Sequence, residues 1–364
     1  MTLRYQLSAT DGSARRGQIT TPRGTIETPV FMPVGTRGAV IHLDAGDYEM
    51  LELEVVLGNT YHLMLRPGAD VVAEFGGLHG FTGWDGHFLT DSGGFQVMSL
   101  ADNVRVDDDG VTFTSIYDGA RVRLTPEDAV AVQEQLGADI QMALDQCPAL
   151  PASTAEVTKA MERTHDWVRR AAAVHGRVDQ ALFGIVQGGI DPDLRRLSGR
   201  TLAALDLPGY GIGGLSVGET RAEMMPALSA AIGELPEDRP RYLMGVGDPA
   251  RIVEAIGVGV DMFDCVLPTR LARHGTVLTQ HGRLNLRNAQ HARSDEPLDP
   301  GNPMSVRWSR GYLRHLLTVR EPTAARILTL HNLWFLLDLV RRARTAIENA
   351  EFDAFRGDVL DVWA

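Results

Sequence analysis

Short apolar segments alternate with amphipathic stretches along most of this chain. The apolar segments are rich in β-branched and aromatic residues, are bounded by Gly, Pro, Asn or Asp, and have the length of buried strands. We therefore predict eight strands, in TPVFMPVG, EVVLGNT, HFLTDSGG, DIQMALDQ, ALFGIVQGG, YGIGGLS, RYLMGVG and DMFDCVLP.

Helical patterns separate several of these strands. The stretches 125–137, 154–175 and 248–257 are opened by Thr, Asp or Pro and closed by Gly, as helix capping predicts. Eight strands followed mostly by helices, without an evident linker, favour a (β/α)8 TIM barrel. An open doubly wound sheet is the alternative.

The last part of the chain departs from this alternation. We expect residues 1–280 to form the barrel with its catalytic mouth. Residues 281–330 contain loops and a basic helix and predict an appended subdomain. Residues 331–364 have the pattern of an amphipathic helix that packs back on the barrel.

Composition limits the cellular compartments and the classes of partner that fit this chain. Of the 364 residues, 44% are hydrophobic, yet no apolar run approaches the roughly 18 residues of a membrane span. The first residues lack the apolar segment of a signal peptide, and Cys147 and Cys265 form no CxxC pair. We expect a soluble, cytoplasmic protein without a membrane partner. Because the net charge is −12, a nucleic-acid partner needs a local basic patch.

Polar residues and glycines follow the predicted strands. In chain order they are Asn59, Asp91 to Gly94, Asp145, Gln187 to Gly189, Gly213 and Gly214, Gly245 and Gly247, and Asp264. Strand ends converge at one mouth of a barrel, where active sites are built, and glycines let backbone N–H groups approach a ligand. Each residue alone also fits ordinary turn chemistry, so it is their joint occurrence that predicts a site.

These side chains suit a planar base such as guanine. The Asp145 carboxylate would accept from the base N–H donors, while Gln187 and the Gly214 backbone would serve the acceptor. Two further carboxylates would act as in a retaining glycosidase, one attacking the anomeric carbon and the other transferring the proton of the base. A sugar or aldol substrate also fits these residues.

Several segments resemble bacterial tRNA-guanine transglycosylase, the queuine tRNA-ribosyltransferase family. They are DSGGFQVMSL, LDQCP, FGIVQGG, YGIGGLSVGE, RYLMGVGDP and GVDMFDCVLPTRLARHG, and the likeness extends from about Tyr5 to the C-terminal helix. It implies an irregular TIM barrel, and a pentosyltransferase that exchanges guanine at tRNA wobble position 34 for a 7-deazaguanine in queuosine biosynthesis.

The resemblance also implies roles for individual residues. Asp264 would be the nucleophile on ribose C1′, and Asp91 the general acid/base. The base would be held by Asp91, Ser92, Gly93, Gly94, Phe95, Asp145, Gln187, Gly214, Leu215 and Val217, with Met244 stacking nearby. The tRNA would contact Gly245, Val246, Gly247, Asp248, Pro249, Ala250, Arg251, Thr269, Arg270, Leu271, Ala272 and Arg273.

Substrate choice follows from two residues beside the expected pocket. Cys147 and Val217 resemble those of bacterial members that use the aminomethyl precursor preQ1, and a bulkier queuine side chain needs more room than Val217 leaves. The chain ends at Ala364, which argues against the extra RNA-binding domains of archaeal relatives. The family also suggests a homodimer.

The chain departs from the family at its metal site. The bacterial pattern after PLDP carries a C-x-C-x-x-C cluster that binds structural zinc together with a later His. Here the segment is PLDPGNPMSVRWSRGYL, about two residues shorter and without cysteine, so only the candidate ligand His331 remains. We predict no zinc and no other cofactor, and expect Met304, Val306 and Trp308 to replace the metal by apolar packing.

Positive charge gathers next to the predicted site. Residues 269–320 hold nine arginines against three acidic residues: Arg270, Arg273, Arg283, Arg287, Arg293, Arg307, Arg310, Arg314 and Arg320 against Asp295, Glu296 and Asp299. The functional interpretation is a phosphate-contacting surface with salt-dependent binding. A solvated helical face is the alternative.

Two other functions remain open. A non-catalytic tRNA-binding partner subunit of the same family would explain the lost cysteines, although it has no chemical need for both Asp91 and Asp264. An unrelated barrel enzyme on a small metabolite is the third hypothesis, for which no Schiff-base lysine stands at a strand end. Asp261, three residues before Asp264, is expected to have a structural hydrogen-bonding role.

Overall fold

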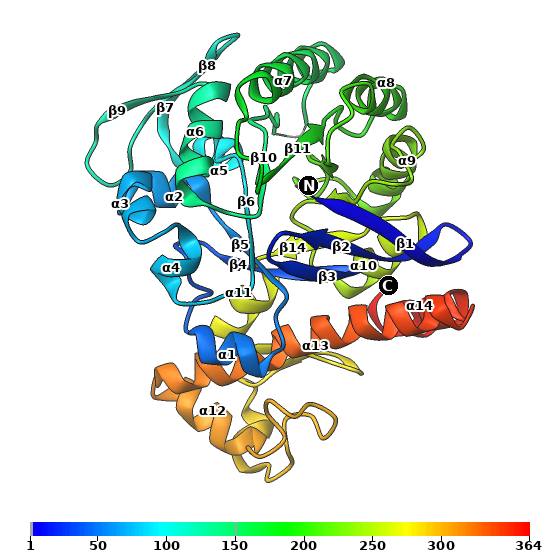
Figure 1. The fold of residues 1–364 in the computed structure, drawn as a ribbon. Helices are drawn as coiled ribbons and strands as arrows, with labels where there is room; N and C mark the ends of the chain where they lie inside the picture. The colour runs from blue at the N-terminus through cyan, green and yellow to red at the C-terminus, as the bar shows by residue number, and fades with distance from the viewer. Residues whose placement is uncertain (1–2, 150) are drawn as a thin grey trace.

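Eight parallel strands close into a barrel at the centre of the molecule (Figure 1). The computed structural model describes residues 3–149 and 151–364. Neighbouring strands follow each other in chain order, and the last pairs with the first. All eight strand predictions and the TIM-barrel class are confirmed, and the open sheet is excluded. The strands are β4 (Val30–Gly35), β5 (Val55–Gly58), β6 (His87–Thr90), β10 (Ile140–Met142), β11 (Ala181–Val186), β12 (Gly209–Ile212), β13 (Arg241–Leu243) and β14 (Met262–Cys265).

Alternation along the strands separates the barrel interior from the layer outside it. Met32 of β4 and Met262 of β14 belong to the inner apolar cluster, whereas their neighbours Phe31 and Phe263 belong to the cluster beneath the helices. Five further side chains lie on the same inward-facing side of their strands, because each follows a residue of the inner cluster by two positions. They are Asn59, Asp91, Gln187, Met244 and Asp264. The strand phase therefore carries these side chains to the carboxyl-end mouth.

Helices cover the second half of the barrel regularly and the first half irregularly. The regular ones are α7 (Thr154–Val174), α8 (Pro192–Ala203), α9 (Arg221–Ile232) and α10 (Pro249–Gly257). The first half carries α1 (Ala45–Met50), α2 (Thr60–Leu65), α3 (Ala69–Glu74), α4 (Leu78–Thr82), α5 (Gly94–Leu100) and α6 (Pro126–Leu136). The three helices predicted from capping are α6, α7 and α10. Thr125 caps α6 by accepting from the Asp128 N–H, and α6 ends at Gly137 in the left-handed conformation.

An antiparallel sheet that the sequence analysis missed lies at the amino ends of the barrel strands. It consists of β1 (Arg4–Asp11), β2 (Ala14–Thr21) and β3 (Gly24–Thr28). Its side chains Tyr5, Ile19 and Ile26 belong to the same buried cluster as the barrel interior. This sheet therefore closes the end of the barrel opposite the mouth.

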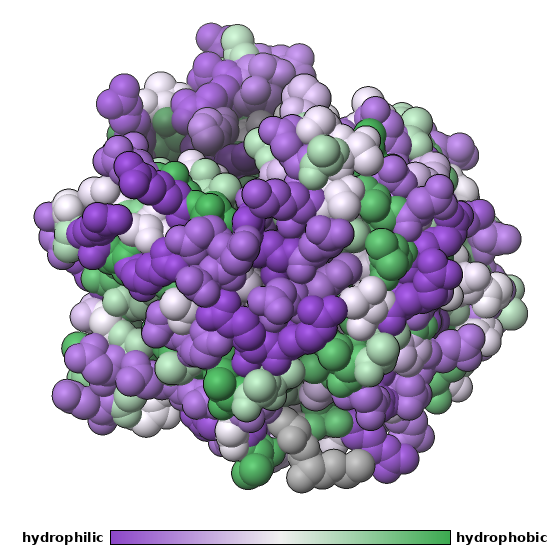
Figure 2. All heavy atoms as spheres, turned by 90° about the horizontal axis from the view of Figure 1, so that it is seen from above, coloured by the Kyte–Doolittle hydropathy of each residue, from purple (hydrophilic) through white to green (hydrophobic). Residues whose placement is uncertain are grey.

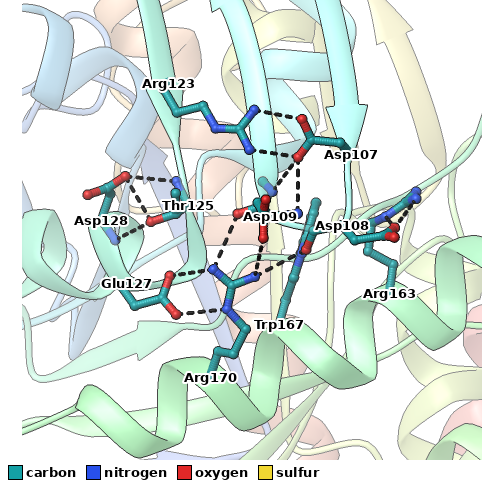
Figure 3. Close-up of polar contacts among 11 residues, drawn as sticks. Asp107, Asp108, Asp109, Arg123, Thr125, Glu127, Asp128, Arg163, Trp167 and Arg170 are labelled. Carbon is teal, nitrogen blue, oxygen red and sulfur yellow. Dashed lines mark hydrogen bonds and ion pairs between the residues drawn. The ribbon is translucent and has the colours of Figure 1, made fainter.

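A second unpredicted sheet is inserted between α5 and α6, formed by β7 (Asp102–Asp107), β8 (Gly110–Thr114) and β9 (Arg121–Leu124). Figure 3 shows how the β7–β8 turn meets α7. The Trp167 indole N–H donates to the Asp108 carbonyl over 2.8 Å, and the Arg163 guanidinium pairs with the Asp108 carboxylate over 2.6 Å. These polar contacts, together with the ring of Trp167, hold the β7–β9 sheet against α7 on the outside of the barrel.

The C-terminal region has a small apolar core of its own. It contains α11 (Leu267–Arg273), β15 (Thr276–Thr279), β16 (Gly282–Asn285), the 3-10 helix η1 (Ala289–Arg293) and α12 (Arg310–Thr318). This core begins at Ala272 and includes Leu286 and Leu313. The expected single terminal helix is two helices, α13 (Pro322–Glu348) and α14 (Phe352–Trp363), and residue 331 lies inside α13. The domain division at 280 and 330 stays a prediction.

The outer surface is mixed in polarity. Figure 2 shows a face that is largely hydrophilic, with hydrophobic residues scattered in small groups, which is ordinary for a folded protein surface. Among residues 3–149 and 151–364, none of the helices has the length and apolarity needed to cross a membrane.

Candidate active site

One pocket lies at the carboxyl-end mouth of the barrel and brings most of the predicted residues together. Its lining includes Asp91, Ser92, Gly93, Phe95, Asp145, Gly214, Leu215, Val217, Met244, Gly245, Val246, Gly247, Asp248, Arg251, Asp264 and Arg270. The predicted residues outside this lining are Gly94, Gln187, Pro249, Ala250, Thr269, Leu271, Ala272 and Arg273.

Asp264 lies at the end of β14 with its two carboxylate oxygens in different situations. The Tyr242 hydroxyl and the Gly245 backbone N–H both donate to Oδ1, each over 2.7 Å. Within the described residues, Oδ2 accepts no hydrogen bond. Burial raises the pKa of Asp264, against the lowering effect of these two donors. The side chain is therefore held by one oxygen and offers the other to the pocket.

Asp91, directly after β6, is the second carboxylate of the pocket. Its Oδ2 accepts from the Asn59 amide over 2.5 Å, and its Oδ1 accepts from the Thr60 backbone N–H over 2.8 Å. Burial raises the pKa of Asp91 to about 6, and the negative charge of Asp264 acts in the same direction. A carboxyl group with this pKa exchanges a proton readily near neutral pH.

Asp145 anchors the side of the pocket expected to hold a base. Its Oδ1 accepts from the Ser92 hydroxyl over 3.2 Å, and its Oδ2 accepts from the Gln187 amide over 2.7 Å. Gln187 is buried and orients Asp145 instead of lining the pocket. Gly214 has a φ of +67°, and an added Cβ would lie 2.6 Å from Gln187 Oε1, so a side chain there would strain the backbone and displace the Gln187 amide.

A strained turn beside Gly214 carries Leu215 and Val217. Ser216 has a φ of +105°, which is unusual for a residue with a side chain. The Glu219 carboxylate accepts from the backbone N–H groups of Ser216 and Val217 over 2.5 and 2.9 Å. Glu219 also pairs with Arg251 over 3.6 Å, which fixes the turn against α10.

Sequence reasoning missed the positioning roles of Tyr242, Thr60 and Glu219. The signal for Tyr242 was available, because it lies two residues before Met244 on the same face of β13. Thr60 and Glu219 had no comparable signal. The contact of Thr60 with Asp91 joins two segments that only folding brings together, and the contact of Glu219 with Ser216 depends on the conformation of one turn.

The predicted RNA-contacting residues divide by exposure. Arg270 and Arg273 are exposed on α11, immediately after β14. The predicted residues Pro249, Ala250, Thr269 and Ala272 are buried, so they support the surface from within. Of the nine arginines in residues 269–320, Arg283 pairs with Asp248 and Arg310 with Glu296, while the other seven form no ion pair within the described part of the chain.

Asp261 lies at the opposite end of the barrel. It accepts from the Tyr5 hydroxyl over 2.9 Å, from the Arg15 guanidinium over 3.1 and 3.2 Å, and from the Arg241 backbone N–H over 2.8 Å. Burial raises its pKa, while the charge of Arg15 acts against this. The predicted structural role of Asp261 is confirmed.

The residues around His331 do not fit a zinc ion. His331 Nδ1 lies 2.7 Å from the Ser305 hydroxyl and Nε2 lies 2.7 Å from the Leu278 carbonyl, so both ring nitrogens are engaged. Cys147 and Cys265 line the active-site pocket instead. Across residues 3–149 and 151–364, no three His, Cys, Asp or Glu side chains gather as metal ligands.

The expected apolar substitute for the metal needs correction. Val306 is 42% exposed, because the turn that contains it directs its side chain outward. Met304 is partly buried against the main core and Trp308 against the small C-terminal core. Within residues 301–306, the turn that stands in place of the cysteines, the buried residues are polar: Asn302 and Ser305.

The fold and the pocket define a class of protein. A closed parallel barrel with three buried carboxylates, Asp91, Asp145 and Asp264, in one pocket at its carboxyl-end mouth is a barrel enzyme suited to combined nucleophilic and acid–base chemistry.

Comparison with known proteins identifies the family. A family model described as queuine tRNA-ribosyltransferase matches residues 10–364. Proteins named queuine tRNA-ribosyltransferase are 53% identical in Herpetosiphon aurantiacus, over 98% of this chain and 91% of the relative, and 53% in Moorella thermoacetica, over 96% and 94%. The Thermus thermophilus relative is 50% identical, over 97% and 92%. The chain belongs to the queuine tRNA-ribosyltransferase family, whose name describes a pentosyltransferase.

Proposed function

We propose that this chain exchanges guanine at tRNA wobble position 34 for preQ1 in queuosine biosynthesis, through a covalent ribosyl–aspartate intermediate. The observation that supports this most directly is that one pocket holds both Asp264, whose Oδ2 accepts no hydrogen bond from the described residues, and Asp91, whose pKa is raised to about 6. Family membership supports the tRNA-guanine transglycosylase activity itself.

The proposed reaction is a double displacement. Asp264 Oδ2 forms a bond to ribose C1′ while the bond from C1′ to the guanine N9 breaks, and the bond electrons leave with the base. Protonated Asp91 supplies the proton that neutralises the departing guanine. The incoming base then returns a proton to Asp91, and its N9 forms the new bond to C1′ and releases the Asp264 carboxylate. The phosphodiester chain stays intact throughout.

Base recognition follows from the orientation of Asp145. Its carboxylate, oriented by Ser92 and Gln187, accepts from the N1 and N2 donors of the base. The Gly214 backbone N–H serves the base acceptor O6, while Gln187 acts through the Asp145 carboxylate that it orients. The half-buried Val217 limits the space near the 7-substituent, which supports the small aminomethyl group of preQ1.

The tRNA surface is proposed around the exposed arginines beside the mouth. Arg270 lines the pocket, and Arg273 lies one helical turn further along α11. A homodimer is part of the proposal, because Val306, Tyr312 and Val319 expose apolar surface in the C-terminal region. A cytoplasmic location is supported by two free cysteines.

The test is base exchange into guanine-34 tRNA with labelled guanine or preQ1. The wild-type chain incorporates label and forms a tRNA adduct that survives denaturing electrophoresis, because the ribosyl ester is covalent. Asp264→Ala loses both signals, with incorporation at least ~1,000-fold lower. Asp193→Ala, which alters an exposed aspartate of α8, is the matched control and retains both.

Incorporation that survives Asp264→Ala would overturn the covalent mechanism. A wild-type chain that binds tRNA without incorporating any base would support the partner-subunit hypothesis instead.

A further inference from the structure

A buried polar turn occupies the segment where the family carries its zinc cysteines. Asn302 and Ser305 are both 0% exposed. The Asn302 carbonyl accepts from the backbone N–H groups of Ser305 and Val306, and its side-chain Oδ1 accepts from the Met304 N–H over 3.0 Å. Two buried polar side chains in a turn are costly unless they bond elsewhere in the fold.

Both side chains bond to the same residue of α13. Asn302 Nδ2 donates to the His331 carbonyl over 3.0 Å, and the Ser305 hydroxyl lies 2.7 Å from His331 Nδ1. Because the Leu278 carbonyl can only accept, His331 Nε2 carries the proton in the 2.7 Å bond to it. Burial lowers the pKa of His331 to about 4, so the imidazole is neutral, Nδ1 accepts from the Ser305 hydroxyl, and both ring nitrogens are bonded.

The next residue of α13, Asn332, extends these bonds to α11 and β15. Asn332 Oδ1 accepts from the Leu278 N–H over 2.9 Å. Its Nδ2 donates to the carbonyls of Pro268 and Thr276, over 3.0 and 3.1 Å. Pro268 lies in the first turn of α11, and Thr276 begins the strand after it, so Asn332 holds both ends of the α11 segment.

We infer that Asn302, Ser305, His331 and Asn332 form a metal-free hydrogen-bonded clasp that positions α11 for tRNA binding. The four residues are all buried. They connect the turn at 302–305 with α13 and with the α11 segment. Hydrogen bonds fix direction, as metal bonds do, and apolar packing of the turn does not. The positioning role rests on the proposed function, because α11 is the proposed RNA-contacting helix.

The clasp acts on α11 and not on the reacting groups. Asp264 is held separately by Tyr242 and Gly245, and Asp91 by Asn59 and Thr60. Loosening the clasp therefore displaces Arg270 and Arg273 while leaving the carboxylate pair in place. Kinetically, we expect a higher KM for tRNA, an unchanged KM for the base and a nearly unchanged kcat.

The first experiment measures the metal content and thermal unfolding of the purified wild-type chain. We expect less than ~0.1 zinc per chain, and the same unfolding temperature with and without a chelator. This measurement does not depend on the enzymatic activity. Stoichiometric zinc, or a lower unfolding temperature after chelation, overturns the metal-free clasp.

The second experiment compares Ser305→Ala with Ser309→Ala in the exchange assay. Ser309 lies four residues away and caps α12 by accepting from the Tyr312 N–H, so its removal destabilises the same region without touching the clasp. Ser305→Ala raises the KM for tRNA by about 5- to 10-fold and changes kcat less than about 2-fold. Ser309→Ala leaves both near wild type.

Equal KM values in the two variants overturn the positioning role, as does a loss confined to kcat. If Ser305→Ala does not fold, Asn302→Ala is held to the same criteria; it removes the bond to the His331 carbonyl together with the bond from the Met304 N–H within the turn. A wild-type chain without exchange activity contradicts the proposed function, while the metal measurement still decides whether the clasp is metal-free.

Discussion

Three buried aspartates show how a single residue acquires its role. Burial raises the pKa of Asp91, Asp261 and Asp264 alike, so burial alone does not distinguish them. Their hydrogen bonds do. Donors on both oxygens of Asp261, including a guanidinium, compensate its charge, whereas Asp264 keeps one oxygen without a partner among the described residues. Within the described residues, Asp91 accepts from two neutral donors and from no cationic side chain, so no paired positive charge offsets the effect of burial on its pKa.

The raised pKa of Asp91 predicts a pH-dependent effect on stability. Its folded pKa of about 6 exceeds its ordinary value of 3.8, so the protonated group favours the folded state at low pH. That contribution is lost as the pH rises through about 6. We expect Asp91→Asn to gain about 1–3 kcal/mol in unfolding free energy, relative to wild type, between about pH 4 and about pH 7.

Urea denaturation at both pH values measures this difference, with Asp193→Asn as the exposed control. A stability difference between Asp91→Asn and wild type that does not change with pH contradicts the prediction.

At the scale of elements, the eight barrel strands were predictable because each is a short, nearly continuous apolar run. The sheets β1–β3 and β7–β9 were not, because their strands carry many exposed polar residues, as in RYQLSATD and DNVRVD. Their positions depend on tertiary contacts, such as Trp167 with the Asp108 carbonyl and Arg15 with Asp261. The terminal helix pair was partly missed because Asn349 and Ala350 end α13 without a strong breaker.

The buried ion pair between Arg15 of β2 and Asp261 gives a prediction for the amino-end sheet. Arg15→Ala leaves the Asp261 carboxylate buried without its ion-pair partner, and we expect a loss of about 3–5 kcal/mol in unfolding free energy. The exposed pair Arg196–Asp193 is the control, because Arg196→Ala costs less than about 1 kcal/mol. Denaturant unfolding measures both variants. If Arg15→Ala lowers the unfolding free energy by less than about 1 kcal/mol, the prediction that this ion pair stabilises the fold is wrong.

At the scale of the whole molecule, charge is distributed unevenly. The chain carries a net charge of −12, yet residues 269–320 hold nine arginines against three acidic residues. Seven of those arginines form no ion pair within residues 3–149 and 151–364, which leaves their charge uncompensated by a direct partner there, and one of them, Arg270, lines the pocket. An acidic body with a basic edge orients a polyanion toward that edge.

This distribution predicts steeply salt-dependent tRNA binding. Replacing Arg287 and Arg293 by Gln weakens binding at low salt and reduces the slope of log Kd against log salt by roughly 1–2, if each arginine contacts one phosphate. Arg196→Gln with Arg200→Gln, on exposed positions of α8, is the matched control. Fluorescence anisotropy across a salt series measures the slopes, and equal slopes for the two double variants contradict the assignment of the basic edge.

The sequence by itself determined the barrel strands, the residues at their ends and the loss of the zinc cysteines, because apolar periodicity and residue type are local properties. The tertiary structure decided which oxygen of Asp264 is free, that Gln187 lies behind Asp145, and that polar bonds occupy the former metal segment. These features depend on atoms from segments as far apart as Ser305 and His331, or Asn59 and Asp91. Only folding brings such groups within hydrogen-bond distance.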